Sequence, residues 1–290
     1  MDSLPLFSVL IAQYNNAKYL QEAIDSVFTQ SYPNWEIIIV DDASTDFSKE
    51  IYAKTNNHPK IKIYYNNENK GIAYTKKRCI ELANGAICGF LDPDDCLLPN
   101  ALNISVETHL NNPKTSLTLS RFYIYNEITG ITSESRKLVI PKGKSYFTNK
   151  DYMPEPFASF KKYYYTKTEG LSTKYKLGID QDLYFKLEEV GNISIINEFT
   201  YKYRFHQNSI SFNEDRAFFW NLIIRYDTCI RRNLNPEDFA LDSFIKYIEH
   251  KINIEKTITN NEKIENLKLK RSTEYQLGKF LMKPFIFIKK

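Results

Sequence analysis

Four short apolar runs, each followed by polar residues and then by a segment of helical character, constrain the fold of this chain most strongly. The runs are FSVLIA at 7–12, EIIIV at 36–40, IKIYY at 61–65 and AICGFL at 86–91. Short continuous runs rich in β-branched residues are typical of strands buried on both faces. Strands that alternate with helices pair in parallel, with helices on both faces of the sheet. The first hundred residues therefore predict an α/β fold with a mainly parallel central sheet flanked by helices.

The segments between these runs carry helix signals. Residues 20–28 place their apolar side chains on one helical face, and Asp46 is a suitable N-cap for a helix that runs to about residue 54. Asn84 and Gly85 occupy the positions that close a third helix, which begins at about residue 72.

Polar clusters follow the first, second and fourth apolar runs. They read QYNN, DDASTD and DPDD. Because ligands of parallel α/β sheets bind beyond the carboxyl ends of the strands, we expect the three clusters to converge on one edge. Within the second cluster, Asp41 is expected to orient the loop rather than to touch a ligand.

The acids of the third cluster predict a cation site. Asp92 and Asp94 point to the same side if the extended conformation of the strand persists beyond residue 91. Two adjacent carboxylates repel each other unless a cation lies between them, and oxygen ligands favour Mg²⁺ or Mn²⁺. The alternative is a simple turn, since Asp and Pro are both common turn residues.

The rest of the chain is less regular. Residues 116–127 and 193–205 have the alternation of strands, and residues 179–191 read as a helix. From about Glu214 the sequence is helical and charged, which indicates a C-terminal extension. Residues 268–290 combine seven basic residues with many apolar ones, so this tail is expected either to contact an anionic membrane or to pack on the protein or on a second subunit.

Composition excludes several classes of protein. With 42% apolar, 26% charged and 14% aromatic residues the chain is globular, and a net charge of +4 does not favour a nucleic-acid partner. Four cysteines without a C-x-x-C pair indicate reduced thiols in a cytoplasmic protein. No signal peptide and no membrane-spanning stretch are expected. The histidines without evident partners are expected at the surface; they are His58, His109 and His250.

Long motifs in the chain resemble those of the family 2 glycosyltransferases. The matching pieces are FSVLIAQYNNAKYLQEAIDSVFTQSYPNWEIIIVDDASTD, NNENKGIAYTKKRCIELANGAICGFLDPDDCLLP, IDQDLYFKL and YRFHQNSIS. The resemblance implies a GT-A fold over residues 1–213, with a nucleotide-binding half at 1–99 and an acceptor-side half at 100–213. The helical extension then covers 214–290.

The resemblance also implies a binding site for a nucleotide-sugar, most simply a UDP-sugar. Ala12 and Tyr14 match positions that hold the base and the ribose, the tyrosine by stacking. Asp42 matches the acid that accepts a hydrogen bond from uracil, and Arg78 matches a basic position on the donor side.

A divalent metal, Mn²⁺ or Mg²⁺, is the cofactor that the resemblance implies. Asp92 and Asp94 match the D-x-D element, the first contacting ribose or metal and the second ligating the metal, and His206 matches a histidine that approaches the metal or the phosphates. The chain contains only nine glycines and no glycine-rich phosphate loop, so metal and basic side chains have to neutralise the diphosphate.

The general base implied by the resemblance is Asp180, which follows Ile179 where the family usually has Glu. Asp182 is an alternative base, and the competing interpretation of Asp180 is a helix N-cap. The expected activity is inverting transfer of a hexosyl group to a saccharide or lipid-linked saccharide acceptor of a surface glycan. Its expected place is the cytoplasm, with the inner face of the cell membrane as the alternative. A sugar-phosphate nucleotidyltransferase and a non-catalytic nucleotide-sugar-binding protein are the alternatives; AQYNNAKY lacks the glycine-rich loop that the former expects.

Overall fold

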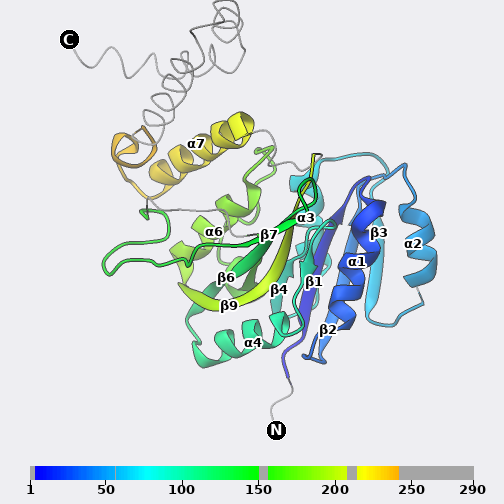
Figure 1. The fold of residues 1–290 in the computed structure, drawn as a ribbon. Coiled ribbons are helices and arrows are strands. Elements are labelled where there is room, and N and C mark those ends of the chain that lie inside the picture. The colour runs from blue at the N-terminus through cyan, green and yellow to red at the C-terminus, as the bar shows by residue number, and fades with distance from the viewer. Residues whose placement is uncertain (1–3, 56, 150–155, 208–213, 242–290) are drawn as a thin grey trace, which may run out of the picture. The chain divides into compact units, whose positions relative to one another are not determined.

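The computed structural model describes residues 4–55, 57–149, 156–207 and 214–241. In this part of the chain nine strands form one sheet in the order β3-β2-β1-β4-β8-β6-β9-β5, with β7 paired to β6 (Figure 1). The strands are β1 Phe7–Gln13, β2 Trp35–Asp41, β3 Ile61–Tyr65, β4 Ile87–Phe90, β5 Cys96–Leu97, β6 Thr115–Asn126, β7 Ile131–Glu134, β8 Ala158–Lys161 and β9 Asn192–Phe205.

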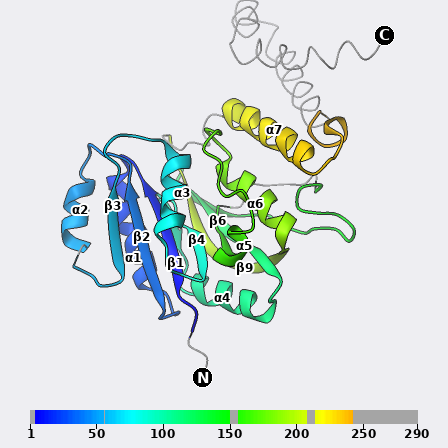
Figure 2. The ribbon, with the colours of Figure 1, turned by 180° about the vertical axis from the view of Figure 1, so that it is seen from behind.

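Helices connect and cover these strands. They are α1 Ala17–Phe28, α2 Ser48–Thr55, α3 Ile72–Leu82, α4 Ala101–Asn111, α5 Lys162–Tyr165, α6 Ile179–Val190 and α7 Glu214–Arg231, followed by a π-helical turn at Glu237–Leu241. The two views of the ribbon show α1 on one face of the parallel strands and α3 on the other (Figures 1 and 2). The sheet is therefore covered on both faces, as the alternation of strands and helices predicts.

The four apolar runs form the parallel half of the sheet. Strand β1 pairs in parallel with β2 and β4, and β2 pairs in parallel with β3. Every residue of β1, β2 and β4 is buried, which is why their sequences are continuously apolar rather than alternating. The predicted strands, their order along the chain and their parallel pairing are confirmed.

The second half of the sheet mixes directions. Strand β8 lies between β4 and β6 and is antiparallel to both, whereas β6 and β9 run parallel. Shifts of register interrupt the β6–β9 pairing between Ser120 and Phe122. The segment that the sequence assigned to one or two strands is the single long strand β9, and its end carries Arg204 and His206 to the same edge as the carboxyl end of β4.

Two expectations from the sequence were wrong. Helix α3 ends at Leu82, and its C-cap is Ala83 in an extended conformation rather than Asn84 or Gly85. Gly85 has a different role, because a Cβ atom at this position would lie 2.6 Å from the backbone nitrogen of Ser8. Glycine is required where two backbones approach this closely.

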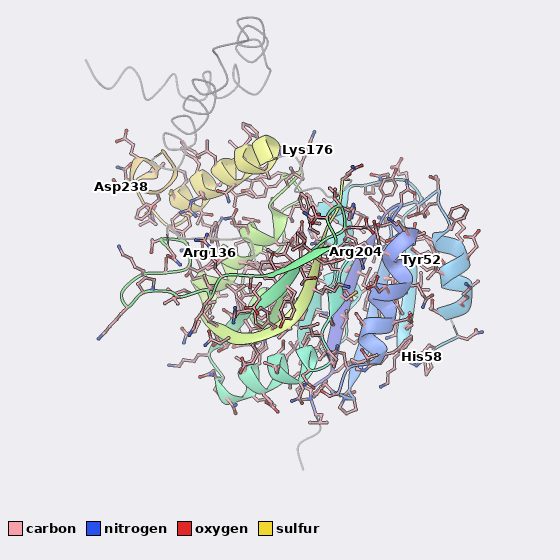
Figure 3. All side chains as sticks on the ribbon, viewed as in Figure 1. Tyr52, His58, Arg136, Lys176, Arg204 and Asp238 are labelled. Atoms are coloured by element: carbon pink, nitrogen blue, oxygen red, sulfur yellow. The ribbon has the colours of Figure 1, made fainter. Side chains whose placement is uncertain are left out.

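The second wrong expectation concerns the histidines. His109 is fully buried rather than exposed, and its Nε2 lies 3.0 Å from the Ser159 hydroxyl. Burial lowers the pKa of His109 to about 4. His58 stacks on Trp35 at the end of the sheet opposite to Arg204 (Figure 3). His250 lies outside the described residues.

The chain divides into two compact units, Met1–Trp220 and Asn221–Lys290. The boundary expected from the sequence at residue 213 stays a prediction. All four cysteines are buried and unpaired, as expected of reduced thiols. In the part of the chain that the structure describes, no helix is both long and apolar enough to cross a membrane. The basic tail at 268–290 lies outside that part.

Candidate active site at the carboxyl ends of the parallel strands

The loops that follow β1 and β2 are tied to each other. The backbone N–H of Asn15 donates to Ser44 Oγ at 3.0 Å, and the N–H of Thr45 donates to Asn15 Oδ1 at 2.7 Å. Asn15 and Ala43 adopt positive φ angles of 48° and 61°, a conformation that costs energy for residues other than glycine. The first two polar clusters therefore converge as predicted, and the strained backbone lies at their junction.

Asp41 orients this loop, as the sequence suggested. Its carboxylate is buried and accepts hydrogen bonds from the Ser44 N–H at 2.7 Å and from the Tyr52 hydroxyl at 2.5 Å. Burial, followed by the hydrogen bond to Asp41, raises the pKa of Tyr52. Tyr52 thus stays a neutral donor that fixes the end of β2.

Asp42 joins β2 to the start of α3. Its side chain is 2% exposed and accepts hydrogen bonds from Asn66 Nδ2 at 2.6 Å, from the Lys70 N–H at 2.9 Å and from the Gly71 N–H at 2.8 Å. Arg78 binds the same asparagine through Asn66 Oδ1 and donates to the Tyr65 carbonyl at 2.8 Å. Two of the residues expected at the nucleotide, Asp42 and Arg78, are therefore linked through a shared partner.

Ala12 and Tyr14 belong to the same edge. Ala12 is a buried residue of β1 that pairs with Val40, whereas Tyr14 follows the strand directly and is 48% exposed. An exposed tyrosine ring at the end of a central strand is available to stack on a planar ligand. The roles of these residues in binding a nucleotide stay predictions.

The acidic cluster forms a turn and not an extension of β4. Strand β4 ends at Phe90, and the N–H of Asp95 donates to the Asp92 carbonyl at 3.0 Å. The prediction that the extended conformation persists and aims Asp92 and Asp94 at one point is therefore wrong. The alternative prediction, a turn, describes the backbone here. Burial and the nearby charge of Asp92 raise the pKa of Asp94, so the turn favours a neighbouring cation.

Lys76 supplies positive charge at this turn, and the sequence analysis missed it. The side chain is 5% exposed, and its Nζ lies 3.1 Å from Asp92 Oδ1 and 2.9 Å from Asp180 Oδ2. The two carboxylates raise the pKa of Lys76 despite its burial, which keeps the ammonium group charged. The sequence did contain a signal for this residue: Lys76 falls on the apolar face of α3, one turn from Ala73 and from Cys79, where a lysine needs a buried partner.

Asp180 lies in the first turn of α6, as the family resemblance requires of a base. The N-cap residue of this helix is Gly178, with a φ angle of 69°, so the N-cap interpretation of Asp180 was wrong. The Asp180 side chain is 37% exposed, and each of its two carboxylate oxygens accepts a hydrogen bond from Lys76 Nζ. It is thus held beside the acidic turn and open to solvent.

Asp182, the alternative base, has a different environment. Its side chain is 0% exposed and pairs with Lys186 Nζ at 2.7 Å on the same helix. A carboxylate without access to solvent has no path to an acceptor hydroxyl, so the geometry favours Asp180 over Asp182.

His206 and Asp94 form the other part of the site. The Nε2 atom of His206 lies 3.0 Å from Asp94 Oδ2, and both side chains are largely buried. Carboxylate oxygens suit Mn²⁺ and Mg²⁺, and a neutral imidazole is a common metal ligand in proteins. Among the described residues no group of three His, Cys, Asp or Glu side chains is arranged to hold a metal. Asp94 and His206 therefore fit a cation only as a partial ligand set, which a substrate diphosphate and water would complete.

Comparison with solved structures identifies the fold. The structure of S. aureus TarS residues 1–349 in complex with UDP aligns with a TM-score of 0.63 and 19% identity, over 79% of this chain and 67% of that chain. The mannosyltransferase PcManGT from Pyrobaculum calidifontis, in complex with GDP-Man and Mn²⁺, aligns with a TM-score of 0.60 and 18% identity, over 84% and 70%. The fold is of the GT-A type found in glycosyltransferases.

Sequence comparison gives the family. Residues 8–178 match the family described as glycosyl transferase family 2. Escherichia coli chondroitin synthase is 30% identical over 218 residues, which cover 72% of this chain and 30% of that protein. The chain belongs to glycosyl transferase family 2. It spans less than a third of the length of the chondroitin and hyaluronan synthases that it matches.

Proposed function

We propose that this glycosyltransferase moves a sugar from a nucleoside diphosphate, UDP, to a saccharide acceptor in the synthesis of a surface polysaccharide, with inversion at the anomeric carbon. The observation that carries the proposal is the meeting of Asp92, Lys76 and Asp180 at the carboxyl ends of the parallel strands. There Asp180, a carboxylate open to solvent, is paired with the ammonium group of Lys76 on α3, which also contacts Asp92 of the acidic turn.

The chemistry follows from these positions. An acceptor hydroxyl attacks the anomeric carbon on the side opposite to the nucleotide, and Asp180 takes its proton while the bond from the sugar to the diphosphate breaks. A well-placed general base contributes about 10²- to 10⁴-fold to the rate. Lys76 orients Asp180 by donating hydrogen bonds to both of its carboxylate oxygens, and it carries positive charge at the end of the site where the diphosphate departs.

A divalent cation, Mn²⁺ or Mg²⁺, is part of the proposal. Asp94 and His206 would hold it, with Asp92 nearby, and when bound it supplies positive charge that stabilises the leaving diphosphate. PcManGT, which shares the fold, is seen with Mn²⁺. Asp94 lies near the negative charge of Asp92, and a cation held at this turn would offset the repulsion between the two carboxylates.

The proposed identities of the donor and the acceptor are supported by the relatives of this chain and by residues of the site. TarS is seen with UDP and with UDP-GlcNAc, and chondroitin synthases are among the relatives. Asp42, Arg78 and the exposed ring of Tyr14 are the groups proposed to receive the nucleotide, with Ala12 forming the floor under the base. We propose a cytoplasmic site of action, with residues 268–290 contacting either the inner face of the membrane or a second subunit.

The test is hydrolysis and transfer with a panel of UDP- and GDP-sugars in Mn²⁺, Mg²⁺ or EDTA. We expect slow release of UDP that requires the cation, and loss of it in Asp94→Ala. Asp25→Ala is the matched control, because Asp25 is an exposed acid of α1 that binds Gln21 away from the site. Binding of UDP without hydrolysis or transfer would favour a non-catalytic protein. Formation of a nucleotide-sugar from a nucleoside triphosphate would favour a nucleotidyltransferase.

A further inference from the structure

Arg204, near the end of β9, contacts the acidic turn and α1 together. Its Nε donates to the Asp94 carbonyl at 2.9 Å, and its Nη2 lies 2.5 Å from Glu22 Oε2. The guanidinium group also lies over the ring of Tyr19, at 4.8 Å from the ring centre. The Arg204 side chain is 8% exposed, so these contacts hold it inside the protein, at the upper end of the sheet in Figure 3.

The backbone of Arg204 holds the same turn a second time. Its N–H donates to Asp95 Oδ1 at 2.7 Å, and Asp95 is almost fully buried. The N–H of Asp92 in turn donates to the hydroxyl of Tyr201, another residue of β9, at 3.2 Å. All three acids of the turn are thus fixed to β9: Asp92 through its N–H, Asp94 through its carbonyl and Asp95 through its buried carboxylate.

Tyr19 connects Arg204 to His206. The Tyr19 ring lies 5.1 Å from the His206 ring, and its hydroxyl donates to Glu127 Oε2 at 2.6 Å. Arg204 therefore packs on the same aromatic ring as His206 while it holds the carbonyl of Asp94. His206 Nε2 lies 3.0 Å from Asp94 Oδ2, so Arg204 contacts one member of this pair directly and the ring beside the other.

We propose that Arg204 is a positioning residue, which sets the distance between Asp94 and His206 and so prepares them for a cation and its diphosphate. The inference rests on the proposed function. Only a planar guanidinium group can donate from Nε to a carbonyl, donate from Nη2 to a carboxylate and stack on an aromatic ring together, whereas the ammonium of lysine is a single point charge. A misplacement of about 1 Å in such a site costs up to ~10²-fold.

The test compares Arg204→Lys with Arg121→Lys. Arg121 is the matched control, because it lies on β6, the strand paired with β9, stacks on Phe199 at 3.9 Å and binds Glu134 at 3.0 Å. None of these contacts involves Asp94 or His206. Calorimetric titration of UDP at a series of Mn²⁺ concentrations gives the affinity and the Mn²⁺ concentration for half-maximal binding. Thermal unfolding of each variant is measured alongside.

For Arg204→Lys we expect the half-maximal Mn²⁺ concentration to rise about tenfold or more, with a matching loss in kcat, at a melting temperature close to that of Arg121→Lys. For Arg121→Lys we expect a half-maximal Mn²⁺ concentration within about twofold of that of the wild type. If folded Arg204→Lys protein has the same half-maximal Mn²⁺ concentration as the wild type or Arg121→Lys, the inference is overturned while the proposed function stands. Wild-type protein that binds no UDP in Mn²⁺ overturns the proposed function, and the inference with it.

Discussion

Replacement of Lys76 by Met removes the charge that joins the acidic turn to the proposed base. Methionine keeps most of the length of the lysine stem and can pack against an aromatic ring through its sulfur, but the cation–π contact of Lys76 Nζ with the Phe90 ring, at 4.8 Å from the ring centre, is lost. What is lost is the ammonium group, which lies 3.1 Å from Asp92 Oδ1 and 2.9 Å from Asp180 Oδ2.

The expected loss of stability is modest. Breaking a fully buried ion pair costs about 3–5 kcal/mol, but Asp92 and Asp180 are 36% and 37% exposed, and exposed pairs contribute about 0–1 kcal/mol each. We therefore expect a loss of roughly 1–2 kcal/mol, which corresponds to a fall in melting temperature of roughly 2–6 °C. The loss in kcat should be larger, about 10²-fold, because Asp180 no longer has a fixed orientation.

Lys186→Met provides the matched control. Lys186 is equally buried, but it pairs with the fully buried Asp182 and with the Gly170 carbonyl, away from the acidic turn. Its removal leaves a buried carboxylate without its cation, so stability should fall by about 3–5 kcal/mol. The kcat per folded molecule should change little. Lys186→Met should therefore lose more stability than Lys76→Met, whereas Lys76→Met should lose more kcat.

The assay combines urea unfolding with steady-state kinetics on the active UDP-sugar, corrected for the folded fraction. If folded Lys76→Met keeps kcat within about threefold of the wild type, the ammonium group does not hold the base and the reasoning is refuted. A larger kcat loss in Lys186→Met than in Lys76→Met would refute it too, and would return Asp182 to consideration as the base.

Three further predictions concern the base, a buried histidine and the tail. Asp180→Asn should keep UDP affinity in calorimetry and lose about 10²- to 10⁴-fold in kcat, and retained turnover would move the base to Asp182. His109 has a pKa of about 4 in the folded protein against an ordinary 6.5, so the unfolded chain binds its proton first as the pH falls. Its contribution to stability is present above pH 6.5 and is lost toward pH 4, by ~3 kcal/mol at most. His109→Gln should therefore flatten the decline in urea-unfolding free energy between pH 7 and 4.5, and an unchanged decline would contradict the assignment. Deletion of residues 268–290 should lower sedimentation with anionic vesicles if the tail contacts the membrane, and unchanged sedimentation would favour packing on protein.

Local patterns were sufficient for the parallel half of the fold. Strands β1, β2 and β4 are buried along their whole length, so most of their residues are apolar on both faces of the sheet. The sequence also placed the acids at the end of β4, because a polar cluster after a buried strand has to lie at an edge of the sheet. It could not place β8 between β4 and β6, since β8 is four residues long and carries little pattern of its own.

The sequence by itself determined which strands are buried, where the acidic turn falls and which acid begins α6, since each depends on neighbours in the chain. The tertiary structure alone decided which cations meet those acids. Lys76 and Asp180 are 104 residues apart, and Arg204 and Asp94 are 110 apart. Such pairs are set by the order of strands in the sheet and by the lengths of the crossovers. A buried charge needs a partner, but no local pattern says which one the fold will supply.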